Sequence, residues 1–210
     1  MRFDAEQRFK IPHDQLLALF TDPDFYASLG GLPQISVPEV VRHSASGDTV
    51  RIDLHQRYTG ELPSAALTVI DPAKLTWIEE LVFDLATATA TSRLVPDHYS
   101  DRLSCTGTYS FRPDGTTGSI RRLDGDLKVR MPLVGGRVEQ ALVSGLRQHA
   151  EAEQYLVDHG LTVAGRTSGS TTGKKSKDKG KAKGKTKAKP KHKGTSKKHD
   201  KAKPDGRAKG

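Results

Sequence analysis

The sequence predicts an α+β domain: a curved antiparallel sheet of about seven strands, two short helices near the N-terminus, one long C-terminal helix, and then a disordered tail. Three observations carry this prediction. Apolar residues recur with a period of two through most of residues 35–131, with a period of three to four in residues 136–159, and hardly at all beyond residue 165. A sheet with a polar outer face must cover its apolar face, and residues 136–159 form the one element long enough to do so.

The tail differs from the rest of the chain in charge. Residues 166–210 hold 18 Lys and Arg against three Asp, about +15, whereas residues 1–165 hold 16 basic and 22 acidic residues, about −6. Lys, Gly, Ser, Thr and Pro cannot bury enough apolar surface to offset the entropy lost on ordering. We therefore expect one domain over residues 1–162 and a disordered, Lys-rich polycationic tail over residues 163–210.

Cysteine usage and hydropathy bear on the compartment. A lone cysteine, Cys105, excludes an intrachain disulfide and a cysteine-rich zinc site. The charged stretch MRFDAEQRFK and the lack of any apolar run near the roughly 18 residues of a membrane span predict neither a signal peptide nor integral membrane association. The expected localisation is cytoplasmic, extending to the nucleoid if the tail binds DNA. The sequence leaves the oligomeric state open.

The N-terminal elements follow from periodicity and helix signals. Residues 2–11 alternate between apolar and charged side chains, as a half-buried strand does. Pro12 suits the first turn of a helix whose apolar stripe, from Leu16 to Phe20, ends at TDPD. A second short helix in DFYASL stops at Gly30-Gly31.

Residues 35–131 form a meander of strands. VRHSASGDTVRIDLHQRYT predicts a hairpin around residues 46–48, and a short turn or helix follows Pro63. LTWIEELVF, TATSRLV and LSCTGTYSF are the next three strands, and RPDGTTG is the turn into SIRRLDGDLKVRM. In that last strand the side chains predicted to face inward are Leu123, Leu127, Val129 and Met131.

The long helix spans roughly residues 136–159 and ends at Gly160. Its apolar stripe has three- and four-residue spacing and comprises Val138, Leu142, Leu146, His149, Ala152 and Leu156. An incompletely filled gap between this helix and the sheet would form a cavity. Small side chains in ATATAT, residues 86–91, predict unfilled volume there, with an exposed turn between two strands as the alternative.

The element order and several stretches resemble a known superfamily. LTWIEEL, RLVPDHYSDRLSCTGTYSF, VRMPLVGGRVE and LDGDLKVRMPLVGGRVEQALVSGL are similar to the START/polyketide cyclase-like (SRPBCC, Bet v 1-like) superfamily, and within it to the bacterial family known as domain of unknown function 2505 (DUF2505). The resemblance covers about residues 1–160. It implies a helix-grip fold that holds a hydrophobic or amphipathic small molecule between sheet and helix. A minority of the superfamily are cyclases, hydratases or nucleases, and no catalytic residue transfers from DUF2505.

No motif with a strong catalytic signature is present, since the sequence lacks GxGxxG, GxxxxGK[ST], HExxH and GxSxG. The prediction therefore names no catalytic residue, no metal site and no cofactor. The candidates for lining a ligand cavity are Tyr58, Trp77, Glu79, Cys105, Tyr109, Leu127, Leu142, Leu146 and His149.

Two pairs of ionisable residues have alternative interpretations. His149 and Glu153 lie four apart on one helix face, which suits two metal ligands or an acid–base pair; the favoured interpretation is a partly buried histidine paired with a neighbouring carboxylate. Glu79 shares a strand face with Trp77 and would then point into the cavity with a raised pKa. The favoured interpretation instead turns Glu79 outward at a bulge or pairs it with Arg93.

Tyrosine and cysteine side chains complete the candidates. Tyr58 and Tyr109 place hydroxyls on otherwise apolar faces, where they would orient a ligand in a cavity or bond to a carbonyl in a core. Cys105 is interpreted as a small buried hydrophobe rather than a nucleophile, because no base accompanies it in the sequence.

The lysines of the tail are flexible point charges with no aromatic residue between them, which disfavours base-specific or stacked recognition. They predict non-specific attachment to polyanions, with nucleic acid favoured over anionic lipid, and a solubilising tail without a partner as the alternative. The candidate residues are Lys174, Lys175, Lys181, Lys183, Lys185, Lys187, Lys189, Lys191 and Lys193.

The leading functional prediction is therefore binding of an apolar or amphipathic small molecule in a cavity under the long helix, combined with polyanion attachment through the tail. Two alternatives remain. One is an enzyme of the cyclase or hydratase type that acts on the cavity ligand through Glu79, Tyr109 or His149. The other is an architectural DNA-binding protein whose main functional part is the tail.

Overall fold

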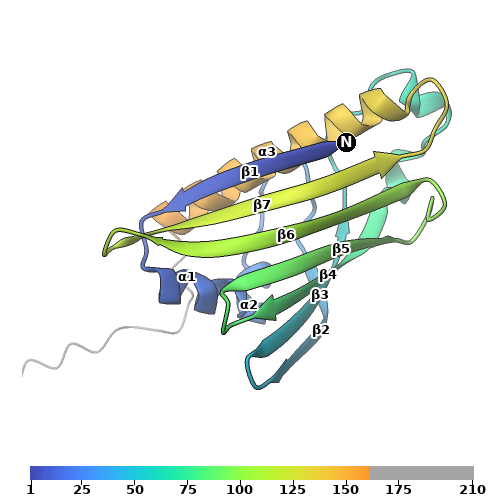
Figure 1. The fold of residues 1–210 in the computed structure, drawn as a ribbon. Helices are drawn as coiled ribbons and strands as arrows, with labels where there is room; N and C mark the ends of the chain where they lie inside the picture. The colour runs from blue at the N-terminus through green and yellow to red at the C-terminus, as the bar shows by residue number, and fades with distance from the viewer. Residues whose placement is uncertain (161–210) are drawn as a thin grey trace, which may run out of the picture. The chain divides into compact units, whose positions relative to one another are not determined.

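The computed structural model describes residues 1–160, and the tail with its nine candidate lysines lies outside the described residues. The predicted α+β class and the antiparallel sheet are confirmed (Figure 1). The elements are β1 (Arg2–Phe9), α1 (His13–Phe20), α2 (Pro23–Ala27), β2 (Glu39–Ser46), β3 (Thr49–Arg57), η1 (Ala66–Thr68), η2 (Pro72–Lys74), β4 (Thr76–Asp84), β5 (Thr89–Pro96), β6 (Leu103–Asp114), β7 (Gly118–Val129) and α3 (Gly135–His159).

The sheet has seven strands in the order β1-β7-β6-β5-β4-β3-β2, and every neighbouring pair is antiparallel. Strands β2 to β7 form a meander, and β1 joins it by pairing with β7, from Arg2 opposite Asp126 to Phe9 opposite Ser119. The predicted hairpin between β2 and β3 is confirmed. Its turn contains Gly47 at a φ of 55°, a conformation that glycine adopts without steric cost.

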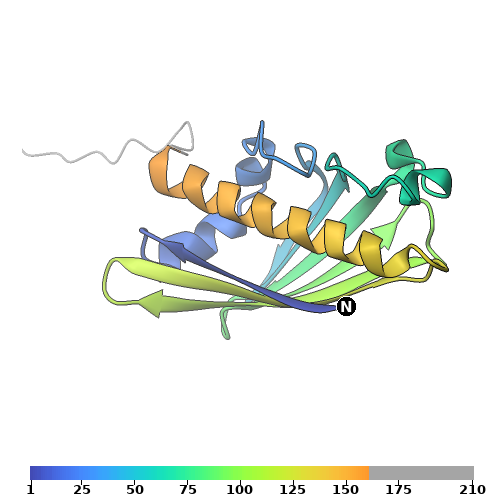
Figure 2. The same cartoon turned by 90° about the horizontal axis from the view of Figure 1, so that it is seen from above.

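Helix α3 covers one face of the sheet, and α1 and α2 lie on the same side (Figure 2). Helix α3 packs on β1 and β7, whereas α1 packs on β6 and β7. Two apolar clusters fill the space between helices and sheet. The first lies under the N-terminal half of α3 and includes Phe3, Tyr58, Trp77, Leu127, Val138 and Leu142. The second lies around α1 and α2 and includes Phe9, Leu16, Phe20, Phe25, Ile52, Phe83 and Phe111.

The buried face of α3 is more polar than its sequence predicts. Val138 and Leu142 are buried as expected, but Leu146 and Leu156 are only partly buried. Glu153 is buried instead, because it faces polar groups of the sheet that the helix periodicity alone does not reveal. Within residues 1–160, no helix has both the length and the apolar character needed to cross a membrane.

The stretch ATATAT does not create unfilled volume under α3. Residues 85–88 are the turn between β4 and β5, with Ala88 at a φ of 51°, and β5 begins at Thr89. The alternative of a turn therefore describes residues 86–88, whereas residues 89–91 belong to β5 and Ala90 is buried in the core.

Candidate functional site

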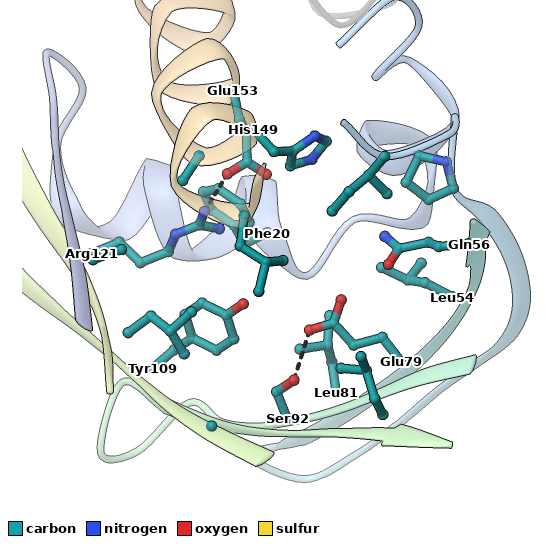
Figure 3. Close-up of a pocket in the computed structure, with 18 of the residues that line it drawn as sticks. Phe20, Leu54, Gln56, Glu79, Leu81, Ser92, Tyr109, Arg121, His149 and Glu153 are labelled. Atoms are coloured by element: carbon teal, nitrogen blue, oxygen red, sulfur yellow. Dashed lines mark hydrogen bonds and ion pairs between the residues drawn. The ribbon is translucent and has the colours of Figure 1, made fainter. Parts of the chain in front are cut away.

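A cavity of about 100 Å³ lies between α3 and the concave face of the sheet (Figure 3). Its lining draws on both apolar clusters, with Phe3, Trp77, Leu94 and Cys105 from the first and Phe20, Leu54, Leu81 and Phe83 from the second. The segment between α2 and β2 contributes Leu29, Ile35 and Pro38, and α3 contributes Leu146, His149, Ala150 and Glu153. Most of the wall is thus apolar, with a few polar groups set into it.

Two facing glycines help to keep this space open. Gly107 on β6 pairs with Gly125 on β7, and both have the inward parity of their strands. A Cβ atom added at Gly107 would lie 2.7 Å from Cδ1 of Leu123, and one added at Gly125 would collide with the ring of Phe3. Any larger residue at Gly107 would therefore displace Leu123 or occupy part of the cavity.

Glu79 points from β4 into the cavity (Figure 3). The hydroxyl of Ser92 donates a hydrogen bond to its Oε1 at 2.7 Å. Burial raises the pKa of Glu79, and the bond from Ser92 and the positive charge of Arg121 oppose that rise only in part. The favoured interpretation of Glu79 is wrong: strand β4 pairs without a bulge here, and Arg93 lies on the outer face, where its Nε donates to Glu80 at 2.8 Å.

Tyr109 on β6 directs its hydroxyl toward the cavity, and Figure 3 draws no hydrogen bond from it to the surrounding residues. Burial raises the pKa of Tyr109 well above its ordinary value, so the hydroxyl keeps its proton. The other candidate, Tyr58, has a structural role, because its hydroxyl donates to the carbonyl of Ala141 at 3.2 Å. Cys105 is buried as expected, and burial raises the pKa of its thiol to about 12.

A second polar cluster joins β1, β7 and α3. Arg121 donates from Nε to Oε1 of Gln7 at 2.7 Å and pairs through Nη2 with Oε2 of Glu153. Gln7 donates in turn to the carbonyl of Ala150 at 2.5 Å and to Glu153 at 3.2 Å. The guanidinium carbon of Arg121 lies 3.9 Å from the ring centroid of Phe20. This cluster closes one side of the cavity and attaches α3 to the sheet.

His149 and Glu153 do not act together. The Nδ1 atom of His149 lies 3.0 Å from the carbonyl oxygen of Pro33, which fits an imidazole N–H donating to that carbonyl, and Glu153 pairs with Arg121. The favoured prediction of a histidine–carboxylate pair is therefore wrong, because β7 presents a stronger partner for Glu153. Across residues 1–160, no three His, Cys, Asp or Glu side chains are placed to share a metal ion.

Six of the nine predicted cavity residues line the cavity: Trp77, Glu79, Cys105, Tyr109, Leu146 and His149. The other three, Tyr58, Leu127 and Leu142, lie in the first apolar cluster and outside the lining. The polar lining residues absent from the nine predicted ones are Gln7, Tyr26, Gln56, Ser92, Thr106, Arg121, Arg147 and Glu153. Gln7 and Arg121 occupy inward-facing alternate positions of β1 and β7. The alternation of each strand would therefore have identified both as candidate lining residues. Gln56 accepts a hydrogen bond from Nε1 of Trp77 at 3.1 Å.

The seven-stranded antiparallel sheet, the helix α3 that covers it and the cavity between them form a helix-grip fold of the START/Bet v 1-like type. Residues 4–161 match the family described as "Protein of unknown function (DUF2505)". The chain belongs to this family, as the resemblance in its sequence predicts. No curated protein matches it.

Solved structures with a similar fold have low sequence identity. Norcoclaurine synthase from Thalictrum flavum is 16% identical with a TM-score of 0.51, over 76% of this chain and 87% of that one. The Zhui aromatase/cyclase from Streptomyces sp. R1128 is 16% identical with a TM-score of 0.48, over 75% and 95%. A START superfamily protein from Mycobacterium smegmatis is 14% identical with a TM-score of 0.49, over 74% and 96%. The likeness to norcoclaurine synthase shows a similar fold, and identities this low transfer no chemistry.

Proposed function

We propose that residues 1–160 bind a small amphipathic molecule in the cavity under α3. The apolar body of the molecule would contact Trp77, Leu94 and Leu146, and its polar group would face Glu79 and Tyr109. The observation that supports this most is the Tyr109 hydroxyl, which opens onto the cavity with no bond to the groups around it. A hydroxyl set into a mostly apolar wall can orient a bound molecule by a hydrogen bond.

The size of the cavity limits the ligand. Pockets for drug-sized molecules have volumes of about 300–1,000 Å³, whereas an apolar cavity of about 150 Å³ accommodates benzene. At about 100 Å³ this cavity suits a molecule of one small ring. A larger guest requires α3 to move away from the sheet, which the contacts of Arg121 with Gln7 and Glu153 oppose.

Mass spectrometry of small molecules retained by the purified full chain, after incubation with cell extracts, tests this proposal. We expect an enriched compound on the wild-type chain and its loss from Gly107→Val, whose side chain would occupy the cavity. Thr108→Val changes the outward face of the same strand and is the matched control. Equal recovery from wild type and Gly107→Val would contradict the proposal, provided that circular dichroism shows both to be folded.

A second candidate function is acid catalysis of the cyclase or hydratase kind on the bound molecule. It is favoured by Glu79, because burial raises the pKa of this carboxyl group and it therefore keeps its proton to a higher pH than an exposed carboxyl group does. Incubation of the extracted ligand with wild type and with Glu79→Gln tests it. A change in ligand mass or cyclisation with wild type alone would support catalysis, and an unchanged ligand would refute it.

We also propose that the lysine-rich tail attaches the protein to nucleic acid without sequence preference. The support is the charge of about +15 over residues 166–210. If about eight lysines contact phosphates, log K falls against log salt with a slope near −7. Replacement of the nine candidate lysines by glutamine leaves nine of the 18 basic residues, so it should weaken the affinity for duplex DNA and make the salt slope less steep. Equal affinity of the two chains would refute this role.

A further inference from the structure

The charged side chains that line the cavity differ in whether their hydrogen-bond partner carries the opposite charge. Arg121 pairs with Glu153, His149 bonds to the carbonyl of Pro33, and Arg147 donates to the carbonyl of Asp4 at 3.2 Å from an exposed position. Of the two carboxylates that line the cavity, Glu153 pairs with a cation, whereas the partner of Glu79 within residues 1–160 is the neutral hydroxyl of Ser92. Removing a carboxylate from water without placing a cation beside it is unfavourable. When Glu79 is ionised, its carboxylate therefore has no cation in contact with it within residues 1–160, and the second arginine of the lining, Arg147, donates instead to the carbonyl of Asp4.

We infer that the ligand carries a protonated amine, and that this ammonium group pairs with the free carboxylate oxygen of Glu79. The inference deepens the proposed function and rests on it. Ser92 occupies Oε1 of Glu79, whereas the second oxygen points into the open space of the cavity (Figure 3). An ammonium group there would be close to the aromatic walls of the cavity, which include Trp77 and Tyr109, and aromatic faces attract cations.

An anionic ligand fits this charge arrangement poorly. The donors of Arg121 are directed to Gln7 and Glu153, and one face of its guanidinium lies on the ring of Phe20. To pair with Arg121, a ligand carboxylate or phosphate would have to break that ion pair and would then face Glu79. The other arginine of the lining, Arg147, is exposed and donates to the carbonyl of Asp4, so it does not place a cation beside Glu79. The cavity thus favours a ligand with positive charge.

A neutral acceptor such as a ketone is the closest competitor, because a protonated Glu79 could donate to it. The hydrogen bond from Ser92 argues against this, since a donated bond stabilises the ionised carboxylate. The titratable groups that line the cavity with Glu79 are Tyr26 on α2, Cys105 and Tyr109 on β6, Arg121 on β7, and Arg147, His149 and Glu153 on α3. Burial raises the pKa of Glu79 in the empty cavity, and a bound ammonium group would lower it again.

Trp77 gives a direct readout of binding. It is the single tryptophan of the chain, it lines the cavity, and its indole N–H bonds to Gln56. Titrations of the full chain with cyclopentylamine, cyclopentanol and cyclopentanone can therefore be followed by the indole N–H signal in NMR spectra. The three probes share one ring of a size suited to the cavity and differ in the polar group.

We expect cyclopentylamine to bind the wild-type chain about ten- to a hundred-fold more tightly than cyclopentanol near neutral pH, as for a hydrogen bond to a charged group. In Glu79→Gln this ratio should fall to about one. Glu80→Gln makes the same chemical change on the outer face of β4 and should leave the ratio unchanged. Lowering the pH should weaken binding of the amine as Glu79 takes up a proton.

Three results would overturn the inference. An alcohol that binds wild type as tightly as the amine would remove the role of charge. A ketone that binds most tightly, and loses this preference in Glu79→Gln, would identify a protonated Glu79 as a donor. If none of the probes shifts the Trp77 signal, and no compound is retained from extracts, the proposed binding function itself fails and the inference fails with it.

Discussion

Removing the carboxylate of Glu153 is the perturbation for which the structure gives the clearest magnitude. The side chains of Glu153 and Arg121 are 7% and 10% exposed, so the pair is shielded from water. Glu153→Gln keeps the shape of the side chain but leaves the guanidinium of Arg121 buried without a counter-charge. Breaking one partner of a buried pair costs about 3–5 kcal/mol, a large share of the roughly 5–15 kcal/mol that stabilises a domain. We expect a loss of about 3 kcal/mol, since glutamine still accepts a hydrogen bond.

Urea unfolding of the full chain, followed by circular dichroism, measures this loss. Arg121→Met/Glu153→Leu removes both charges at once and should cost less than either single change, because no unpaired ion remains. Glu151→Gln, at an exposed position of α3, is the control and should change stability by less than about 0.5 kcal/mol. A loss below about 1 kcal/mol for Glu153→Gln, or a double variant as unstable as the sum of the two single variants, would refute the reasoning.

Three further predictions concern single side chains. Cys105 should resist alkylation by iodoacetamide in the folded chain and react after unfolding, because its pKa of about 12 keeps the thiol protonated; rapid modification in the native state would contradict this. Glu79→Gln should be more stable than wild type at neutral pH in the absence of ligand. Because the raised pKa means that the folded state binds the proton more tightly, this advantage should shrink as pH falls through the folded pKa and vanish near the unfolded value of about 4.3. A pH-independent difference in urea midpoints would count against it. Gly145→Ala should destabilise by roughly 1–3 kcal/mol, despite the better helix propensity of alanine, since its Cβ would lie 2.8 Å from the ring of Tyr58; a rise in the melting temperature would show that the ring can move.

Local periodicity was sufficient to predict the elements of the fold. Alternation in β3 and β4 and the four-residue stripe of α3 are properties of neighbouring residues, so they are visible in the sequence. The same parity placed Trp77, Cys105 and Tyr109 on the inner face, where they line the cavity.

The polar cluster could not be predicted in the same way. Gln7, Arg121 and Glu153 come from three elements far apart in the chain, and each is unfavourable as a buried residue when considered alone. Only their mutual hydrogen bonds make their burial acceptable, and these bonds depend on the crossing of α3 over β1 and β7. The partner of Glu79 likewise depends on the register between β4 and β5. In that register Arg93 lies opposite Glu80 and faces the outer side of the sheet, so it cannot pair with Glu79.

The pairing of β1 with β7 has a consequence for folding. The strand synthesised first completes its hydrogen bonds only when the strand synthesised last has emerged, since Arg2 lies opposite Asp126. The chain loses conformational entropy when its two distant segments come together, and the stabilising contacts between the strands form only afterwards. This order slows folding. During translation the N-terminal strand therefore remains an unpaired, partly apolar segment until nearly the whole domain is available, and a chaperone would most usefully protect it in that interval.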